Sequence, residues 1–365
     1  MKNIISVGIL FTCWLLLSGW GYKGHEIIGK NSALSFNDEM GQFESWVTIL
    51  ANHSGDADKR KSWDKSEGIK HYIDIDNFPE FNTDGKISQN MDTLILKHGR
   101  DFLLDQGILP WATLRAYDTL VSYFESKNFD GAALIAADLS HYVADGHMPL
   151  HITANYDGQL SGNDGIHSRY ESTMINAHQN DLNYEGGEIV RIENVADYVF
   201  SYIYNSNRFV DSILQADNYA KKVSPSITSA AYTDTLWQST RKLTILQFEK
   251  ASFSLAELIY TAWLTAGSPS FDDHTFSKEL SEYESILNSV YYRDSMLTVE
   301  FGLNASTQIV CEVFNLNGEK LAGREIGYFE KGQQQFTLNL NLPDGIYLLS
   351  IESNRSKESQ KFFVR

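Results

Sequence analysis

Cysteine is nearly absent from this chain of 365 residues, which contains only Cys13 and Cys311. The long region between them can form neither an internal disulfide nor a thiolate metal site, because both need a thiol. We therefore expect this region to be stabilised by packing and by bound metal ions. Histidine, aspartate and glutamate remain as its side-chain metal ligands.

Basic residues are also scarce, since 30 lysines and arginines stand against 47 aspartates and glutamates and give a net charge of -17. This balance gives no support to a broad cationic surface for nucleic acid. A local cationic groove or bound divalent ions would still provide a site for phosphate groups, so charge alone does not exclude a nuclease. Hydrophobic residues make up 42% of the chain, which is typical of a folded globular protein with a large core.

Beyond residues 1–19, no apolar run is long enough to span a bilayer. Residues 1–19 begin with a lysine at the second position, continue as a mostly apolar run over residues 4–17 and end at Gly19, as is typical of a secretory signal peptide. We expect cleavage after Gly19 and export of the remaining chain. A lipoprotein cysteine at Cys13 is the alternative, but residues 10–12 lack the small side chains expected before such a cysteine.

Helical periodicity dominates the part of the chain that follows the signal peptide. Apolar residues recur there at the intervals that place them on one face of a helix. The predicted helices cover Glu26–Leu34, Met91–Asp105, Trp111–Ser126, Gly131–Asp145, Val195–Lys222 and Thr233–Ala266. We therefore expect an all-α, multi-helix domain over residues 20–290.

The hydrophobic period changes from that of a helix to that of a strand near residue 290. Alternating apolar and polar residues predict five short strands, over residues 298–303, 308–316, 335–342, 345–351 and 360–365. Turn signals such as Asn317-Gly318 separate them. We therefore expect a small β-sandwich over residues 291–365 as a second domain.

A histidine and an aspartate one helical turn apart mark the end of an apolar run that begins near Ala132. His141 and Asp145 lie on the same face of the predicted helix and can bind one metal ion. Pro149 cannot lie inside a helix, so the helix should end before it and His151 should return to the site from a turn. The alternative is a buried helix whose His and Asp bond only to each other, since isolated pairs at this spacing are common.

A second pair at the same spacing, His167 and Glu171, follows a loop over residues 158–165. Two such pairs with His151 between them favour a metal centre over two unrelated hydrogen-bonded pairs. The loop would then join two metal-binding helices, and a flexible connection without a role is the alternative.

Further candidate ligands lie nearer the N-terminus. Cleavage after Gly19 would make Trp20 the first residue, and its free amine and carbonyl could chelate an ion beside His25; a buried tryptophan anchor is the alternative. A polar loop offers Asp56 and Asp58, for which an ordinary surface turn is the alternative.

Residues 71–76 alternate in a strand-like or extended pattern. The pattern puts His71, Ile73 and Ile75 on one side and Tyr72, Asp74 and Asp76 on the other. His71 completes the set of candidate ligands. The set is too large for one ion and is about right for three, if one carboxylate bridges two of them.

These motifs, in this order, resemble the trinuclear zinc phosphodiesterases, the group that contains bacterial zinc-dependent phospholipase C and the S1/P1 nucleases. The likeness covers Trp20 to Ala266 and rests on Trp20-Gly-Tyr-Lys-Gly-His25, His71-Tyr-Ile-Asp, His141-x-x-x-Asp145-x-x-x-Pro-Leu-His151 and His167-x-x-x-Glu171. It implies an all-α fold and three zinc ions. By analogy, one ion binds Asp58, His71, His141 and Asp145; a second binds the amine and carbonyl of Trp20, His25 and Asp145 as the bridge; the third binds His151, His167 and Glu171.

The resemblance also implies the chemistry of a hydrolase. Hydroxide held between two zinc ions would attack phosphorus, and the third zinc would neutralise charge on the phosphoryl and leaving oxygens. Asp58 is the candidate to orient or deprotonate the attacking water. The resemblance favours Asp58 over Asp56, because an Ala-Asp pair occupies the matching loop in both branches of the group.

The two branches point to different substrates. The segment from His167 to Glu171 is similar to the phospholipase form, whereas the nucleases usually present a Trp-Asp pair there. The spacing between the new N-terminus and its first histidine matches the nucleases, and Tyr72 and Asp74 stand where the nucleases hold a base.

We therefore expect an exported phospholipase C-like enzyme that acts on a phospholipid or another phosphodiester. The first alternative is an S1/P1-type single-strand nuclease or 3'-nucleotidase, with single-stranded nucleic acid as its substrate. The second is a non-catalytic, metal-stabilised protein that binds a surface.

The C-terminal domain resembles the sorting domains of type IX secretion. The likeness rests on Val313-Phe-Asn-Leu-Asn-Gly318, Leu342-Pro-Asp-Gly-Ile-Tyr-Leu-Leu349 and Lys361-Phe-Phe-Val-Arg365. It implies contact with the type IX secretion machinery, passage across both membranes and an extracellular or cell-surface location; we expect no stable protein partner. The alternative is an accessory β-sandwich that binds lipid, sugar or cell wall.

Overall fold

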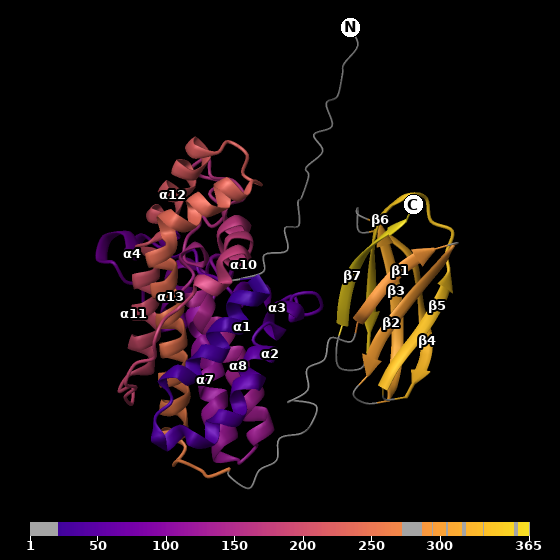
Figure 1. The fold of residues 1–365 in the computed structure, drawn as a ribbon. Helices are drawn as coiled ribbons and strands as arrows, with labels where there is room; N and C mark the ends of the chain where they lie inside the picture. Colours follow the sequence, from indigo (N-terminus) through magenta and orange to yellow (C-terminus); the bar gives the residue numbers. More distant parts are fainter. Residues whose placement is uncertain are drawn as a thin grey trace. The chain divides into compact units, whose positions relative to one another are not determined.

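The computed structural model describes residues 21–271, 287–293, 295–303, 306–315, 319–330, 332–353 and 357–364, and the fold is given for these. The predicted signal peptide and Trp20 lie outside the described residues. The chain forms two compact units, residues 1–274 and residues 275–365 (Figure 1). The first unit is helical and the second is built of β-strands, which confirms the predicted fold class.

The helical unit consists of helices of very different lengths. The α-helices are α1 (Gly21–Asn31), α2 (Val47–His53), α3 (Asp56–Arg60), α4 (Pro79–Asp84), α5 (Met91–His98), α6 (Arg100–Asp105), α7 (Leu109–Glu125), α8 (Phe129–Gly146), α9 (Ile166–Ser168), α10 (Ile175–His178), α11 (Val195–Asn207), α12 (Val210–Val223) and α13 (Ala230–Thr265). Short 3₁₀ turns are η1 (Ser32–Ser35), η2 (Asp38–Trp46), η3 (Gly68–Lys70), η4 (Ile75–Asn77), η5 (Pro149–His151) and η7 (Gln179–Asp181), and η6 (Arg169–Met174) is a π-helical turn. Within the described residues, no helix combines the length and the apolar character that a bilayer span requires.

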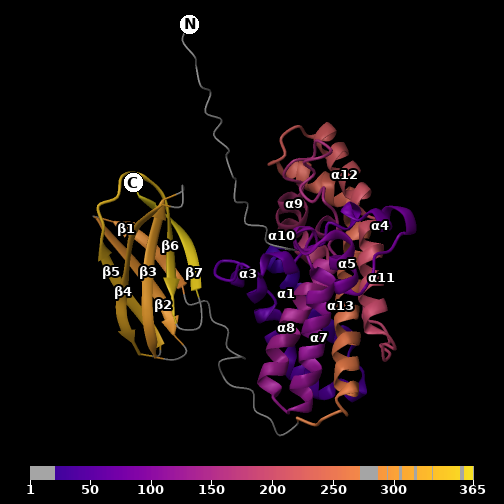
Figure 2. The ribbon, with the colours of Figure 1, turned by 180° about the vertical axis from the view of Figure 1, so that it is seen from behind.

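Helix α8 lies in the middle of this unit. It packs against α7 and α13, which run beside it in both views (Figures 1 and 2), and α1 and α2 cover another of its sides. Its buried alanines, Ala132, Ala133, Ala136 and Ala137, let these neighbours approach closely. The last turns of α8 are therefore enclosed by protein, and polar side chains there lie in the interior.

Two predicted helices are interrupted in the structure. The stretch Met91–Asp105 is divided into α5 and α6 by Gly99, whose φ of 90° lies outside the range of a right-handed helix. The stretch Val195–Lys222 is divided into α11 and α12 at Arg208 and Phe209. Both of these residues keep helical dihedral angles and neither is glycine or proline, so the sequence contains no signal for the second break.

Residues 71–76 form no strand, but the predicted alternation of sides is observed. His71, Ile73 and Ile75 are buried, while the residues between them are partly exposed. The backbone bonds to two different segments rather than to one neighbouring strand: Ile73 N–H donates to the His151 carbonyl and Asp74 N–H to the Gln106 carbonyl.

The C-terminal unit is a sandwich of two antiparallel sheets that share one apolar core. Its strands are β1 (Leu287–Arg293), β2 (Met296–Leu303), β3 (Thr307–Asn315), β4 (Lys320–Phe329), β5 (Gly332–Asn339), β6 (Gly345–Glu352) and β7 (Lys357–Val364), in the orders β1-β2-β5 and β4-β3-β6-β7. The hydrophobic pattern did not predict strands β1 and β4. Strand β4 contains Gly323 and Gly327 and pairs irregularly with β3, and β1 lacks a clear alternation, so neither shows the strand period.

Candidate metal centre

Every predicted ligand within the described residues lies in one of three groups inside the helical unit. Within each group, one ligand atom from each residue lies within 4.8 Å of the others. We name them the His25 group (His25, His141, Asp145), the His71 group (Asp58, His71, His141) and the His151 group (His151, His167, Glu171). All of these residues are buried except Asp58, whose side chain is 17% exposed.

The end of helix α8 brings the groups together. It carries His141 and Asp145 and stops before Pro149, as the sequence predicts. Met148, directly before the proline, is extended, with φ of -88° and ψ of 108°. The turn η5 then directs His151 back, so that its Nδ1 lies 3.2 Å from Asp145 Oδ1. The other ligands come from α1 (His25), α3 (Asp58), the end of η3 (His71), α9 (His167) and η6 (Glu171).

In the His151 group, hydrogen bonds fix which ring nitrogens face inward. His151 Nδ1 lies 2.7 Å from the His71 carbonyl and His167 Nδ1 lies 3.2 Å from the Tyr156 carbonyl. A carbonyl only accepts, so both Nδ1 atoms carry a proton and the Nε2 atoms are the ones available to a metal ion. These Nε2 atoms are 3.2 Å apart, and Glu171 Oε2 lies 3.1 Å from that of His167 and 3.4 Å from that of His151. A proton or a metal ion among these atoms would offset the repulsion between the converging acceptors.

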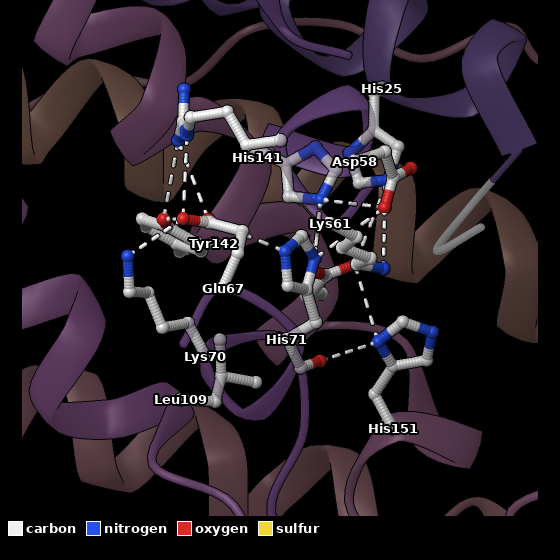
Figure 3. Close-up of polar contacts among 12 residues, drawn as sticks. His25, Asp58, Lys61, Glu67, Lys70, His71, Leu109, His141, Tyr142 and His151 are labelled. Atoms are coloured by element: carbon white, nitrogen blue, oxygen red, sulfur yellow. Dashed lines mark hydrogen bonds and ion pairs between the residues drawn. The ribbon is translucent and has the colours of Figure 1, made fainter. Parts of the chain in front are cut away.

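The His71 group has the same character. His141 Nδ1 donates to the Ser54 carbonyl at 2.6 Å, which leaves Nε2 to face His71 Nδ1 at 2.8 Å. Asp145 Oδ2 lies 3.0 Å from His71 Nδ1 and 3.2 Å from His141 Nε2, and Asp58 Oδ1 lies 3.6 Å from each (Figure 3). Ligand atoms around a tetrahedral zinc ion are roughly 3.3 Å apart. The observed separations in both groups are close to that value.

His25 is the least satisfied member of the centre. It is fully buried, and within the described part of the chain neither of its ring nitrogens has a hydrogen-bond partner. Its ring stacks on that of His141 with centroids 3.8 Å apart, and its Nε2 lies 3.6 Å from Asp145 Oδ1. A buried polar atom without a partner costs about 1–3 kcal/mol. A cation at His25 would remove this cost.

The protonation states suit metal binding. Burial lowers the pKa of His25 to about 3, so the ring is neutral. Burial raises the pKa of Asp58, but His141 and Lys61 lower it to about 2, and the histidines around Asp145 hold its pKa well below the usual range. Burial lowers the pKa of His141, but the carboxylates of Asp145 and Asp58 raise it to about 9. In the metal-free protein, a proton on His141 thus supplies positive charge where a bound metal ion would supply it.

Two charged residues of the centre were not identified from the sequence. Lys61 Nζ lies 2.6 Å from Asp58 Oδ1, and Glu67 lies behind His71. Glu67 precedes His71 by four residues, the same spacing as in the His141–Asp145 and His167–Glu171 pairs. That repeated spacing is the signal that would have identified it.

Other candidates lie outside the three groups. Asp56 pairs with His53 at 2.7 Å and with Lys59 at 3.0 Å, so it is Asp58 that lies beside His71 and His141. Tyr72 donates its hydroxyl to the Asp105 carbonyl at 3.3 Å. Burial and the neighbouring acids Asp76 and Asp105 raise the pKa of Asp74 to about 7.

Comparison with known proteins gives one family match. Residues 293–365 match the family described as the secretion system C-terminal sorting domain, which confirms the predicted resemblance of the tail. A probable serine protease from Bradyrhizobium tropiciagri is 32% identical over 89 residues, which cover 20% of this chain and 11% of that protein. The chain thus spans about a tenth of the length of this relative.

Among solved structures, the chain is similar to two clostridial toxins. The alpha toxin of Clostridium absonum aligns with a TM-score of 0.41 and 11% identity, over 95% of this chain and 97% of the toxin. The alpha-toxin of an avian strain of Clostridium perfringens aligns with a TM-score of 0.38 and 10% identity, over 94% of this chain and 96% of the toxin. The interpretation of the site therefore depends on its own side chains.

Proposed function

We propose that the helical unit is a zinc-dependent phosphodiester hydrolase of the phospholipase C type and that the C-terminal unit directs its export. The observation that carries the proposal is the convergence of histidine nitrogens and ionised carboxylates on three positions in the protein interior. Imidazole and carboxylate ligands without any thiolate suit zinc.

The assignment of ligands follows the three groups. One zinc would be held by Asp58, His71, His141 and Asp145, a second by Trp20, His25 and Asp145, and a third by His151, His167 and Glu171. Asp145 is suited to the bridging role, because its Oδ2 faces the His71 group and its Oδ1 faces His25.

The side chains at the centre would have two tasks: to hold the zinc ions and to orient the attacking water. Bound zinc ions would supply Lewis acidity, which activates water and neutralises charge on a phosphoryl group. Asp58 would accept a hydrogen bond from the attacking water and orient it. With a pKa of about 2, Asp58 is a weak base, so orientation is favoured over proton abstraction. Lys61, 2.6 Å from Asp58, keeps a positive charge beside the carboxylate.

The substrate is proposed to be a phospholipid. Glu171 in the His151 group corresponds to the phospholipase form of the resemblance, and the net charge of -17 gives no broad attraction for nucleic acid. A single-strand nuclease is the second candidate, because Tyr72 and Asp74 lie beside His71. A carboxyl group with a pKa of about 7 is partly protonated at neutral pH and can donate a hydrogen bond to a base.

Turnover of a chromogenic phosphodiester tests the enzyme class. Activity should disappear with a chelator and return with zinc. Phosphatidylcholine and single-stranded DNA, compared with the same preparation, separate the phospholipase from the nuclease. A protein that binds zinc but cleaves none of these substrates would instead fit the non-catalytic surface-binding alternative.

The export of the protein is proposed on the basis of its C-terminal unit. The sorting-domain match supports delivery by the type IX machinery to the cell surface or the medium. The predicted cleavage after Gly19 is part of this proposal, because it would free the amine of Trp20 as a ligand. Mass spectrometry of the secreted protein determines both ends of the mature chain.

A further inference from the structure

Glu67 is a completely buried carboxylate directly behind the His71 group. Its Oε1 accepts from the Tyr142 hydroxyl at 2.5 Å, and its Oε2 accepts from Lys70 Nζ at 2.7 Å (Figure 3). Arg60 approaches both oxygens, with Nε 3.3 Å from Oε2 and Nη2 3.4 Å from Oε1. His71 Nε2 lies 3.5 Å from Oε1.

The donors around Glu67 belong to the segments that supply the ligands. Arg60 is on α3 with Asp58, Lys70 precedes His71, and Tyr142 follows His141. Arg60 also donates to Asp138 on α8 at 2.9 Å. The Glu67 network therefore ties together the three segments that carry the His71 group.

His71 differs from three other ligand histidines in the ring nitrogen that it presents. His141, His151 and His167 each donate Nδ1–H to a backbone carbonyl and present Nε2 to their group. His71 presents Nδ1 instead, at 3.0 Å from Asp145 Oδ2.

The outer nitrogen of His71, Nε2, has no hydrogen bond to a carbonyl within the described residues. Its acidic neighbour is Glu67. Within the described residues no backbone carbonyl fixes the tautomer of this ring, which lies between two carboxylates: Asp145 Oδ2 is 3.0 Å from Nδ1 and Glu67 Oε1 is 3.5 Å from Nε2. A cation between Nδ1 and Asp145 would leave Glu67 as the carboxylate that holds a proton on the ring.

We propose that Glu67 is a positioning residue that keeps the proton of His71 on Nε2 and so reserves Nδ1 as a metal ligand. This inference rests on the proposed zinc centre. A carboxylate near Nε2 favours the tautomer with a proton on that nitrogen and makes Nδ1 a better electron donor. The 3.5 Å separation is long for a hydrogen bond, and we expect it to shorten when Nδ1 binds a cation and Nε2–H becomes a stronger donor.

The direct test is the tautomer of His71 in the full-length, zinc-loaded protein. Long-range proton–nitrogen NMR of ¹⁵N-histidine-labelled protein distinguishes protonated, bare and metal-bound ring nitrogens, and the His71→Asn variant identifies the signal. We expect a protonated Nε2 and a metal-bound Nδ1 at His71, and the opposite at His141, His151 and His167. A metal-bound Nε2 at His71 would overturn the proposal.

Zinc affinity gives a second readout. Glu67→Gln keeps the size of the side chain and removes its charge. We expect this variant to bind the zinc ion of the His71 group about tenfold or more weakly, as measured by chelator competition. Glu257→Gln is the matched control. Glu257 is also a buried glutamate that accepts from a tyrosine, Tyr198, at 2.7 Å, but it belongs to none of the three groups.

The outcomes separate the two proposals. A wild-type protein that binds no zinc would overturn the proposed function. A wild-type protein that binds zinc, with unchanged affinity in Glu67→Gln, would overturn only the role of Glu67. A merely structural role predicts equal losses of thermal stability and zinc in the Glu67 and Glu257 variants. If Glu67→Gln does not fold, the tautomer in the wild-type protein still decides the question.

Discussion

Asp145 is the residue on which most of the centre depends, because each of its two oxygens faces a different group of ligands. We expect Asp145→Asn to reduce bound zinc by at least one ion per chain, since an amide nitrogen cannot serve as a ligand in place of the second oxygen. Turnover should fall by more than about 100-fold, the upper end for loss of an outer partner of a ligand. Elemental analysis and phosphodiester turnover measure the two effects.

Asp56→Asn is the control for this substitution. Asp56 is a nearby carboxylate that pairs with His53 and Lys59 and belongs to none of the groups. The Asp56→Asn substitution should leave the zinc content unchanged. Equal losses in the two variants would contradict a specific bridging role for Asp145.

The pKa of His141 predicts that zinc and protons compete. Because this pKa is raised to about 9 in the metal-free protein, His141 carries a proton at pH 7 that must leave when zinc binds. Apparent zinc affinity should therefore rise with pH, by up to about tenfold per pH unit, and level off above about pH 9. Calorimetry at pH 7 in buffers of different ionisation enthalpy measures the proton release, and an identical heat in all buffers would contradict the prediction.

At the residue scale, the sequence predicted pairs with a simple spacing and missed the partners of those pairs. His141–Asp145 and His167–Glu171 are readable because a helix repeats after four residues. Glu67 has the same spacing from His71, but it lies in a segment without helical periodicity, and its buried position depends on Arg60, Lys70 and Tyr142. The family resemblance favours Asp58 over Asp56 as the metal ligand, whereas spacing alone does not distinguish the two.

Helix α1 carries His25, and its position depends on Gly29. A Cβ at this residue would lie 2.7 Å from the Leu50 carbonyl oxygen on α2. We expect Gly29→Ala to destabilise the protein by about 1–3 kcal/mol through overpacking, although alanine favours a helix by about 1 kcal/mol over glycine. Chemical denaturation measures the change. Gly41→Ala, at a position with no atom within 4 Å of the added Cβ, should have little effect.

Helix α12 anchors the segment that carries the last two ligands. Arg169, between His167 and Glu171, donates to Asp217 on α12 at 3.0 Å, and both residues are buried. Asp217→Ala would leave the arginine without its carboxylate, and we expect a loss of about 3–5 kcal/mol in the free energy of unfolding. Denaturant titration beside Asp211→Ala, an exposed position on the same helix, provides the comparison. A loss below 1 kcal/mol would contradict the buried pair.

At the element scale, the sequence predicted long periodic helices such as α8 and α13 well and short elements poorly. The break between α11 and α12 occurs at Arg208 and Phe209, without glycine or proline, so the sequence contains no signal for it. The strands β1 and β4 were missed because glycines and irregular pairing hide their alternation. Both failures concern features that tertiary contacts decide.

At the scale of the whole molecule, the two units should have separable roles. We expect a chain that lacks residues 293–365 to remain inside the outer membrane, because the sorting-domain match lies in that segment. Fractionation of cells that produce the full and the shortened chain, followed by immunodetection, measures the distribution. As a control, deletion of the exposed residues 226–228 from the helical unit should not change the distribution of the protein between the fractions. Secretion of the shortened chain would contradict the role of the tail.

The ligands of the centre come from separate segments between His25 and Glu171, and the described part of this region contains no cysteine. An unfolded chain keeps these segments apart, so before folding it offers no ready-made metal site. Under the proposed function, the ions would therefore be captured only after export and folding. The amount of zinc at the destination, rather than in the producing cell, would then determine when the protein becomes active.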